Sequence, residues 1–295
     1  MLLENAAGCA GVGTVFVKTL IGAWQKSQSP LIFRSLFMRL YLDTPQKKII
    51  VVTDPAAAAR YAADLFKDCA QKAIAKNGLF TVALSGGSTP KALYHLLATD
   101  ESYSKQIAWE KVHLFWGDER FVPADHPESN YRMVKEQMLH LLSIPADNVH
   151  RIISEGVEPE ECAAVYGRKL RAFFGEHNLL NSCGGPAFDL NFLGLGPDGH
   201  TASLFPDSKA LSETHHWCAA NWVEKFNSWR ITLTYPSINS AKCIAFLAVG
   251  QDKTEKINQI LGPDAASYHY PAQGIKPTDG ALLWVLDEVS AGGLS

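Results

Sequence analysis

The chain has 295 residues, of which 47% are hydrophobic and 19% are charged, and its formal net charge at pH 7 is −3. Such a composition is typical of a globular protein with a large core. A slightly negative chain has no general electrostatic attraction for nucleic acid or for an anionic membrane, so we expect neither as a partner. Any anionic ligand must therefore be held by a local group of cations and backbone amides.

The six cysteines lie far apart in the sequence and form no CxxC pair. This spacing indicates scattered reduced thiols rather than a disulfide framework or a zinc site, and it predicts a cytoplasmic protein. The first 37 residues stand apart, because Glu4 is their only acidic residue and basic residues interrupt their apolar runs. We expect residues 1–37 to be an N-terminal extension: an organelle-targeting peptide, a disordered segment, or sequence upstream of the native start at Met38. We expect residues 38–295 to form a single α/β domain.

Strand-like and helix-like segments alternate along this domain. Apolar runs predict strands over residues 48–52, 79–84, 111–116, 188–193, 217–223, 230–235, 242–249 and 281–286. Segments that follow capping residues predict helices over residues 55–76, 90–98, 129–142, 159–177 and 252–261. The alternation predicts an α/β fold with a doubly wound, mostly parallel Rossmann-like sheet and helices on both faces.

The predicted strand over residues 79–84 runs directly into a small polar loop that precedes a helix. The loop consists of Ser85, Gly86, Gly87, Ser88 and Thr89. Backbone N–H groups in such a loop and at a helix N-terminus form a favourable site for phosphate. The GK[ST] ending of a Walker loop is absent, and an ordinary strand–helix turn is the alternative. We favour phosphate binding because three hydroxyls flank the two glycines.

Charged residues follow the predicted strand over residues 111–116. Asp118, Glu119 and Arg120 lie at a strand end, where open α/β sheets place their ligand sites. The planar guanidinium of Arg120 suits a phosphate or a carboxylate. For the two carboxylates three roles are open: to orient Arg120, to contact sugar hydroxyls, or to be solvated.

Residues 188–206, FDLNFLGLGPDGHTASLFP, are the most informative stretch of the sequence. A buried strand runs into a glycine-rich turn that presents Asp198 and His200 two positions apart. A histidine just past a strand end, beside a carboxylate, is well placed to act as a general base. The turn also satisfies G-x-G-x-x-G, but Pro206 leaves no room for the long helix of a dinucleotide site. A tight turn with a structural histidine is the other alternative.

Two further cations come later in the chain. Arg230 opens the predicted strand over residues 230–235, and we include it among the predicted substrate-binding residues. Lys253 lies in the first turn of a predicted helix, where a cation opposes the helix dipole and suggests an anion nearby. A solvated lysine is equally compatible with that position. No group of His, Cys, Asp or Glu has the spacing of metal ligands, so we expect neither a metal nor another cofactor.

Five motifs in this order resemble the 6-phosphogluconolactonase family. They are SGGSTP, GDERFVP, GLGPDGHTASLFP, RITLTYPSIN and GQDKTEKI, and the resemblance covers residues 39–288. It implies hydrolysis of 6-phospho-D-glucono-1,5-lactone to 6-phospho-D-gluconate in the oxidative pentose phosphate pathway. It also implies a phosphosugar lactone as the ligand and a fold group shared with glucosamine-6-phosphate deaminase. We expect a monomer or a weak homo-oligomer.

The resemblance also implies roles for single residues. The loop over residues 86–89 would hold the 6-phosphate, with Arg120 and Lys253 supplying positive charge. His200 would be the acid/base catalyst, and Asp198 would orient or tune it. A δ-lactone is an activated ester, so its hydrolysis requires neither a metal nor a covalent nucleophile.

Two other functions remain as alternatives. The deaminase and isomerase class shares the phosphate loop, but the resembling deaminases carry a carboxylate shortly after the histidine. Here residues 202–205 read ASLF and supply none. The second alternative is a sugar-phosphate-binding regulator without catalysis, against which the intact Asp198 and His200 argue.

Overall fold

The computed structural model describes residues 39–44 and 47–294, and side chains from residue 47 onward. The predicted extension over residues 1–37 lies outside the described residues. None of the helices described is both long enough and apolar enough to cross a membrane.

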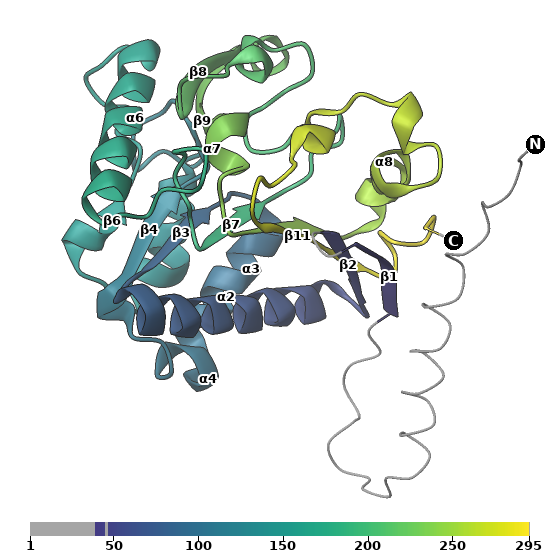
Figure 1. Ribbon diagram of the computed structural model, residues 1–295, viewed down its shortest axis with the longest axis horizontal. Coiled ribbons are helices and arrows are strands. Elements are labelled where there is room, and N and C mark those ends of the chain that lie inside the picture. The colour runs from purple at the N-terminus through teal and green to yellow at the C-terminus, as the bar shows by residue number, and fades with distance from the viewer. Residues whose placement is uncertain (1–38, 45–46, 295) are drawn as a thin grey trace, which may run out of the picture. The chain divides into compact units, whose positions relative to one another are not determined.

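The described residues form a central sheet in the order β1-β2-β11-β10-β7-β3-β4-β6 (Figure 1). Its strands are β1 (Arg39–Thr44), β2 (Lys47–Val52), β3 (Phe80–Leu84), β4 (Val112–Trp116), β6 (Val149–His150), β7 (Leu190–Leu193), β10 (Cys243–Ala248) and β11 (Ala281–Asp287). All neighbouring strands run parallel except β1, which pairs antiparallel with β2. The predicted mostly parallel sheet is therefore confirmed.

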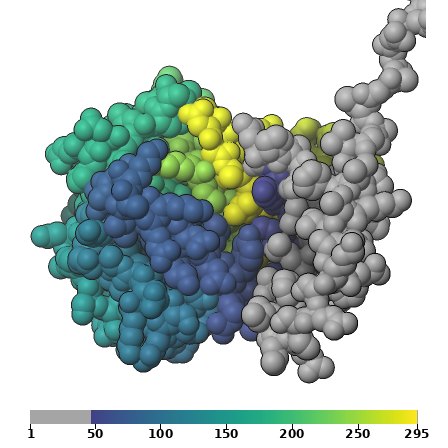
Figure 2. Space-filling model, turned by 60° about the horizontal axis from the view of Figure 1, so that its bottom comes forward, coloured from purple at the N-terminus to yellow at the C-terminus, as the bar shows by residue number. Residues whose placement is uncertain are grey.

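Helices cover both faces of this sheet. They are α2 (Pro55–Asn77), α3 (Ser88–Thr99), α4 (Glu101–Ser104), α5 (Asn130–Val134), α6 (Pro159–Glu176), α7 (Tyr235–Ile238) and α8 (Gln251–Leu261). In Figure 1, α2 and α3 lie below the sheet, whereas α6 and α8 lie above it. Figure 2 is turned so that the bottom of Figure 1 comes forward, and there the blue atoms of α2 and α3 cover the face of the sheet that lies below in Figure 1. Shorter 3-10 turns occur at Trp109–Lys111, Ala146–Asn148, Lys209–Ser212, Glu224–Phe226, Ala265–Ser267 and Pro271–Gly274.

The long helix α2 begins and ends where its sequence predicts. The side chain of Asp54 accepts a hydrogen bond from the backbone N–H of Ala57 at 2.8 Å, and Pro55 occupies the first turn. Gly78 ends the helix with a φ of 81°, a conformation that glycine adopts without strain. Because most of the buried face of α2 is alanine, the helix backbone can approach the sheet closely.

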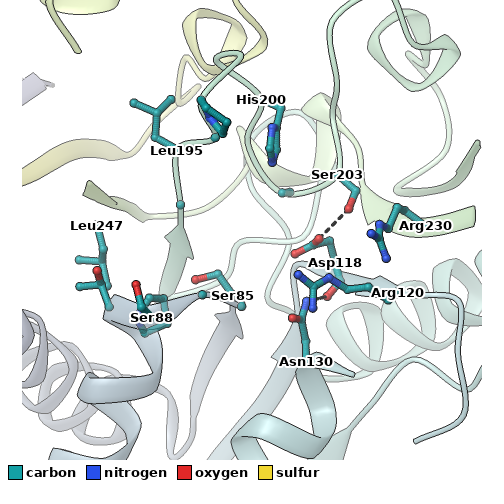
Figure 3. Close-up of a pocket in the computed structure, with 18 of the residues that line it drawn as sticks. Ser85, Ser88, Asp118, Arg120, Asn130, Leu195, His200, Ser203, Arg230 and Leu247 are labelled. Atoms are coloured by element: carbon teal, nitrogen blue, oxygen red, sulfur yellow. Dashed lines mark hydrogen bonds between the residues drawn. The ribbon is translucent and has the colours of Figure 1, made fainter. Parts of the chain in front are cut away.

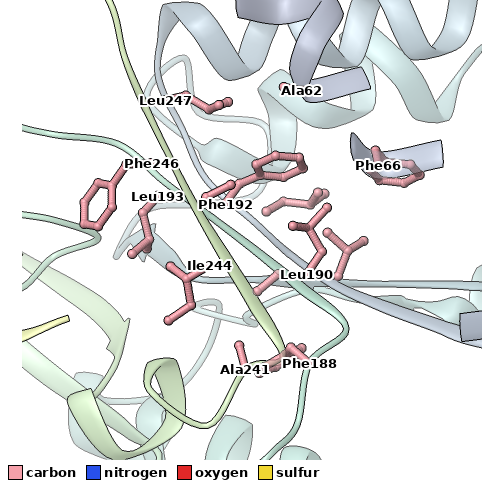
Figure 4. Packing of buried hydrophobic residues seen from close by; sticks show 14 of the residues in the cluster. Ala62, Phe66, Phe188, Leu190, Phe192, Leu193, Ala241, Ile244, Phe246 and Leu247 are labelled. Atoms are coloured by element: carbon pink, nitrogen blue, oxygen red, sulfur yellow. The ribbon is translucent and has the colours of Figure 1, made fainter. Parts of the chain in front are cut away.

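The core fills the space on both sides of the central strands. On one side Leu190 and Phe192 of β7 point toward Ala62 and Phe66 of α2 (Figure 4). On the other side Phe115 of β4 packs against aromatic side chains of α6. Since β3 and β7 are buried along their whole length, they appear in the sequence as nearly continuous apolar runs.

A second, small sheet lies beside the first. The sequence pattern predicts a single sheet and does not predict this one. The second sheet has the order β5-β9-β8, is antiparallel throughout, and consists of β5 (Asp118–Arg120), β8 (Cys218–Val223) and β9 (Ser228–Leu233). The predicted strands over residues 217–223 and 230–235 are present, but they pair with each other rather than extending the parallel sheet. The charged residues that follow β4 form the short strand β5.

One predicted helix differs in its geometry. The helix expected over residues 129–142 is α5, followed by a π-helical segment over Lys135–Leu139. Ser129 caps α5 as predicted, because its side chain accepts from the backbone of Arg132 at 3.1 Å. A π-helical segment widens the helix and re-aims the residues on either side of it.

Candidate active site

A cavity of about 470 Å³ lies at the carboxyl ends of several parallel strands, next to the small sheet (Figure 3). Successive parallel strands deliver their following residues to one edge, as in other open α/β sheets. The cavity is lined by nine of the predicted site residues, namely Ser85, Gly86, Gly87, Ser88, Thr89, Arg120, His200, Arg230 and Lys253. Asp198, the tenth, lies behind His200 and contacts it. Residues from all five motifs thus meet at one place.

The loop after β3 leaves polar groups open toward the cavity. Gly87 precedes α3 with a φ of 110°, and no side chain caps the first turn of that helix. The hydroxyl Oγ of Ser85 is buried and has no hydrogen-bond partner among the described residues. Gly86 contacts the side chain of Asn130 so closely that a Cβ there would lie 2.1 Å from Oδ1. A bound oxyanion could accept hydrogen bonds from the N–H groups of the uncapped first turn of α3 and from the hydroxyl of Ser85.

Two arginines face the cavity from neighbouring strands of the small sheet. Arg120 of β5 and Arg230 of β9 are directly opposite each other in the antiparallel register. Neither forms an ion pair within the described part of the chain, although Nη1 of Arg120 donates to the backbone carbonyl of Glu128 at 2.5 Å. Burial, and then the charge of Arg120, lower the pKa of Arg230. Like charges placed directly opposite are unfavourable, so an anion between them would stabilise the pair.

The two carboxylates next to Arg120 have different roles. Asp118 lines the cavity, and its Oδ2 accepts a hydrogen bond from Oγ of Ser203 at 2.6 Å. Glu119 is buried below the surface, where it accepts from the backbone N–H groups of Asn130 and Tyr131 at 2.7 and 2.8 Å. Burial raises the pKa of Glu119, and these hydrogen bonds oppose the rise. Glu119 is therefore a structural anchor for the start of α5, and only Asp118 is available to a ligand.

Lys253 reaches the cavity from the first turn of α8. Its side chain is 21% exposed, and its Nζ lies 2.8 Å from Oδ2 of Asp252. No side chain caps α8, which begins after Gly250 with a φ of 97°. The position of Lys253 against the cavity wall differs from that of a solvated lysine, which the sequence left as an alternative.

The imidazole of His200 is held on three sides. Nδ1 donates a hydrogen bond to Oδ1 of Asp198, and the ring stacks on Phe205 with centroids 4.1 Å apart. The backbone of Gly196 touches the ring, since a Cβ added there would lie 2.0 Å from Cε1 and Nδ1. With Nδ1 carrying the proton, Nε2 is left as an acceptor. Burial raises the pKa of Asp198, but its hydrogen bonds with His200 outweigh this effect and hold the pKa below the ordinary value.

The turn around His200 does not have the form of a dinucleotide site. After Gly199 the chain makes an isolated bridge between Thr201 and Leu204, and no long helix follows. A pyrophosphate site of that kind needs the N-terminus of such a helix. The G-x-G-x-x-G match therefore reflects the requirements of a tight turn.

Other residues line the cavity that the sequence did not assign to it. They include Glu128, Asn130, Leu195, Ser203, Phe205, Phe226 and Asp252. Asn130 was predicted only as part of a helix cap, and Ser203 and Phe205 lie inside the stretch around His200. Phe226 carries no local signal at all, because it belongs to the turn between β8 and β9. Glu128 and Asp252 add to the acidic residues near the site.

Fold and site together define a class of protein. It is an α/β protein that collects cations, open backbone amides and a histidine–aspartate pair in one cavity of small-molecule size. Comparison with known proteins narrows this class. Residues 53–284 match the family model described as glucosamine-6-phosphate isomerases/6-phosphogluconolactonase, and the chain belongs to this family.

Individual relatives lie within the same family. The chain is 39% identical over 252 residues to a 6-phosphogluconolactonase of Nostoc sp., an alignment that covers 85% of this chain and 99% of the relative. It is 43% identical over 217 residues to a 6-phosphogluconolactonase of Synechocystis sp., covering 74% and 85%. Among solved structures, the 6-phosphogluconolactonase from Trypanosoma cruzi superposes with a TM-score of 0.73 at 31% identity, covering 84% of this chain and 96% of that one.

Proposed function

We propose that this protein hydrolyses 6-phospho-D-glucono-1,5-lactone to 6-phospho-D-gluconate, the lactone-opening step of the oxidative pentose phosphate pathway, with His200 as the general acid/base. The observation that carries the proposal is the meeting of a cation-rich anion site and the His200–Asp198 pair in one cavity. The relatives that are named 6-phosphogluconolactonase support the substrate and the reaction.

In this proposal His200 transfers one proton in each half of the reaction. Neutral Nε2 takes a proton from water as the water oxygen forms a bond to the C1 carbonyl carbon. The imidazolium then gives that proton to the ring oxygen as the C1–O bond breaks, which leaves the carboxylic acid and a free hydroxyl. Asp198 keeps the proton on Nδ1 and stabilises the imidazolium between the two steps. General acid–base catalysis of this kind contributes roughly 10²- to 10⁴-fold.

The phosphate of the substrate would be held at the other groups of the cavity. We assign it to the loop Ser85–Thr89 with Arg120, Arg230 and Lys253, because the loop leads into a helix start that no side chain caps and the three cations supply positive charge. Binding energy from a remote phosphate positions the reacting carbonyl, so these residues would act on turnover as well as on affinity.

The two alternative functions fit the cavity less well. Ring opening by a deaminase would use a carboxylate soon after the histidine, whereas the lining residues there are Ala202, Ser203 and Phe205. The hydroxyl of Ser203 is already engaged with Asp118. A regulator without catalysis would not need His200 fixed by Asp198 with Nε2 left free, and this arrangement favours an enzyme.

The deciding experiment is hydrolysis of freshly generated 6-phosphogluconolactone by the purified protein, with the spontaneous rate subtracted. We expect a rate far above the spontaneous one, and no change after addition of a strong chelator. Within residues 47–294 no three His, Cys, Asp or Glu side chains gather as metal ligands would. A rate equal to the spontaneous one would contradict the function. Activity lost with chelator and restored by one divalent ion would contradict the metal-free chemistry.

Several predictions accompany this function. We propose a cytoplasmic protein that is a monomer or a weak homo-oligomer and has no nucleic-acid partner. We also propose that residues 38–295 form one domain. Sedimentation of the purified protein would measure the oligomeric state directly.

A further inference from the structure

The turn that joins β8 to β9 reaches the cavity from the small sheet. Glu224–Phe226 form a single 3-10 turn, which Asn227 closes with a φ of 46°. Phe226 lines the cavity, and its ring makes an edge-on contact with the ring of Phe205, with the two ring centroids 5.8 Å apart. Phe205 stacks in turn on the imidazole of His200. The turn is therefore packed against the aromatic wall of the site, although its sequence contains no recognisable motif.

The same turn brings a cation to the carboxylate behind His200. Nζ of Lys225 lies 3.5 Å from Oδ2 of Asp198, while Oδ1 of the same carboxylate accepts the hydrogen bond from Nδ1 of His200. Asp198 thus bridges an imidazole and an ammonium. Nζ of Lys225 also lies over the ring of Phe226, 5.5 Å from the ring centroid, and Phe226 itself is 48% exposed. The lysine side chain is 56% exposed, and an ion pair this exposed contributes little to folding stability.

We propose that Lys225 is a positioning residue that holds the Asp198 carboxylate against His200 and keeps the imidazole neutral. A carboxylate beside an imidazole favours the protonated ring, which cannot accept a proton from water. A cation on the second carboxylate oxygen opposes this effect while leaving the Nδ1 hydrogen bond intact. The inference rests on the proposed function, because the neutral ring matters for catalysis only if His200 is the base.

Other charged or titratable groups also face this site. From the surrounding elements these are Asp118, Arg120, Glu128, Arg230, Asp252, Lys253 and Tyr270. Among the described ion pairs of Asp198, the partners are His200 and Lys225. Replacing Lys225 therefore changes the charge on the carboxylate oxygen that His200 does not use.

The test measures the His200 titration in two independent ways. One readout is the NMR titration of the His200 imidazole without substrate, assigned by its loss in His200→Ala. The other is the acid limb of the pH profile of kcat/KM, which reports free-enzyme groups. We expect Lys225→Met to raise the pKa of His200 by about 0.5–1 unit, the effect of one charge at this range in a partly solvated site. The acid limb should move by the same amount, and Lys225→Arg should restore both values.

Lys76→Met is the matched control, because Lys76 is an exposed lysine in the last turn of α2. It should change neither readout. If Lys225→Met titrates like the wild type in both experiments, the proposal is overturned. A shift in the NMR titration without a shift in the pH profile supports the coupling to Asp198 but contradicts His200 as the base, so the two proposals can fail separately.

Discussion

The two ends of the cavity differ in how far the protein satisfies its own polar groups. At one end His200 is bonded to Asp198 and packed between Phe205 and the backbone of Gly196. At the other end Arg230 of β9 lies directly opposite Arg120 on the neighbouring strand β5. Neither arginine has an ion-pair partner in the described part of the chain. One end is complete without a ligand, and the other is not.

This difference fits the roles that we propose for the two ends. A general base must have a fixed orientation and tautomer before the substrate arrives, so its contacts come from the protein. An anion receptor gains its partner only on binding, so it holds like charges close together in the free protein and is relieved by the ligand. Substitutions at the two ends should therefore have different signatures, which the following experiments test.

The largest effect is expected for His200→Ala. Loss of the base should lower kcat for the phosphorylated lactone by at least ~10²-fold, while KM changes little, because a general base acts mainly in the transition state. The measurement is steady-state hydrolysis with the spontaneous rate subtracted. Near-normal turnover by the folded variant would show that His200 is not the base.

At the cation end, Arg120→Ala and Lys253→Ala should each lower kcat/KM for the phosphorylated lactone by roughly ten- to a hundredfold. Loss of one charge-assisted contact to phosphate costs about 1.5–3 kcal/mol. Unphosphorylated gluconolactone serves as the control substrate, because it lacks the phosphate that we propose these cations bind. Equal losses on both substrates would mean that neither residue binds the phosphate.

A smaller effect should distinguish two glycines of the same turn. In Gly196→Ala the new methyl would lie 2.0 Å from the His200 ring, whereas in Gly194→Ala it would meet no atom within 4 Å. We expect Gly196→Ala to lose about tenfold or more in kcat through displacement of the imidazole, and Gly194→Ala to stay close to the wild type. Equal kinetics for the two variants would contradict the packing of His200 on Gly196.

A histidine pair far from any catalytic role provides the smallest effect. Nδ1 of His113 and Nε2 of His150 lie 3.2 Å apart, and burial lowers their pKa values to about 4 and about 3. Because the unfolded chain binds these protons from about pH 6.5 downward and the folded chain does not, stability should fall as the pH drops through this window. Each histidine contributes at most about 1.4 kcal/mol per pH unit.

The check is the free energy of unfolding in urea at several pH values between 7 and 4. His150→Phe should flatten its pH dependence, since a phenylalanine can pack beside Phe115 without titrating. His95→Gln, a change at an exposed histidine, should leave the slope unchanged. A slope in His150→Phe as steep as in the wild type would show that the pair does not control acid stability.

The sequence by itself determined the order and type of most elements. Strands such as β3 and β10 are short apolar runs, and α2 carries its own caps at Asp54 and Gly78, so local patterns were enough to predict them. The loop over residues 85–89, for which we propose phosphate binding, and the Asp198–His200 turn were also recognisable in the sequence, because each is a short segment whose glycines and hydroxyls imply a conformation.

Only the tertiary structure decided which of these segments meet. The pairing of β5 with β9 sets Arg120 opposite Arg230. The hydrogen bond between Ser203 and Asp118 joins residues that are 85 positions apart in the sequence. The turn that supplies Lys225 and Phe226 has no motif of its own. Contacts of this kind depend on how β-strands and loops distant in the chain are brought together, and such long-range pairing leaves no periodic or local pattern in the sequence from which to predict it.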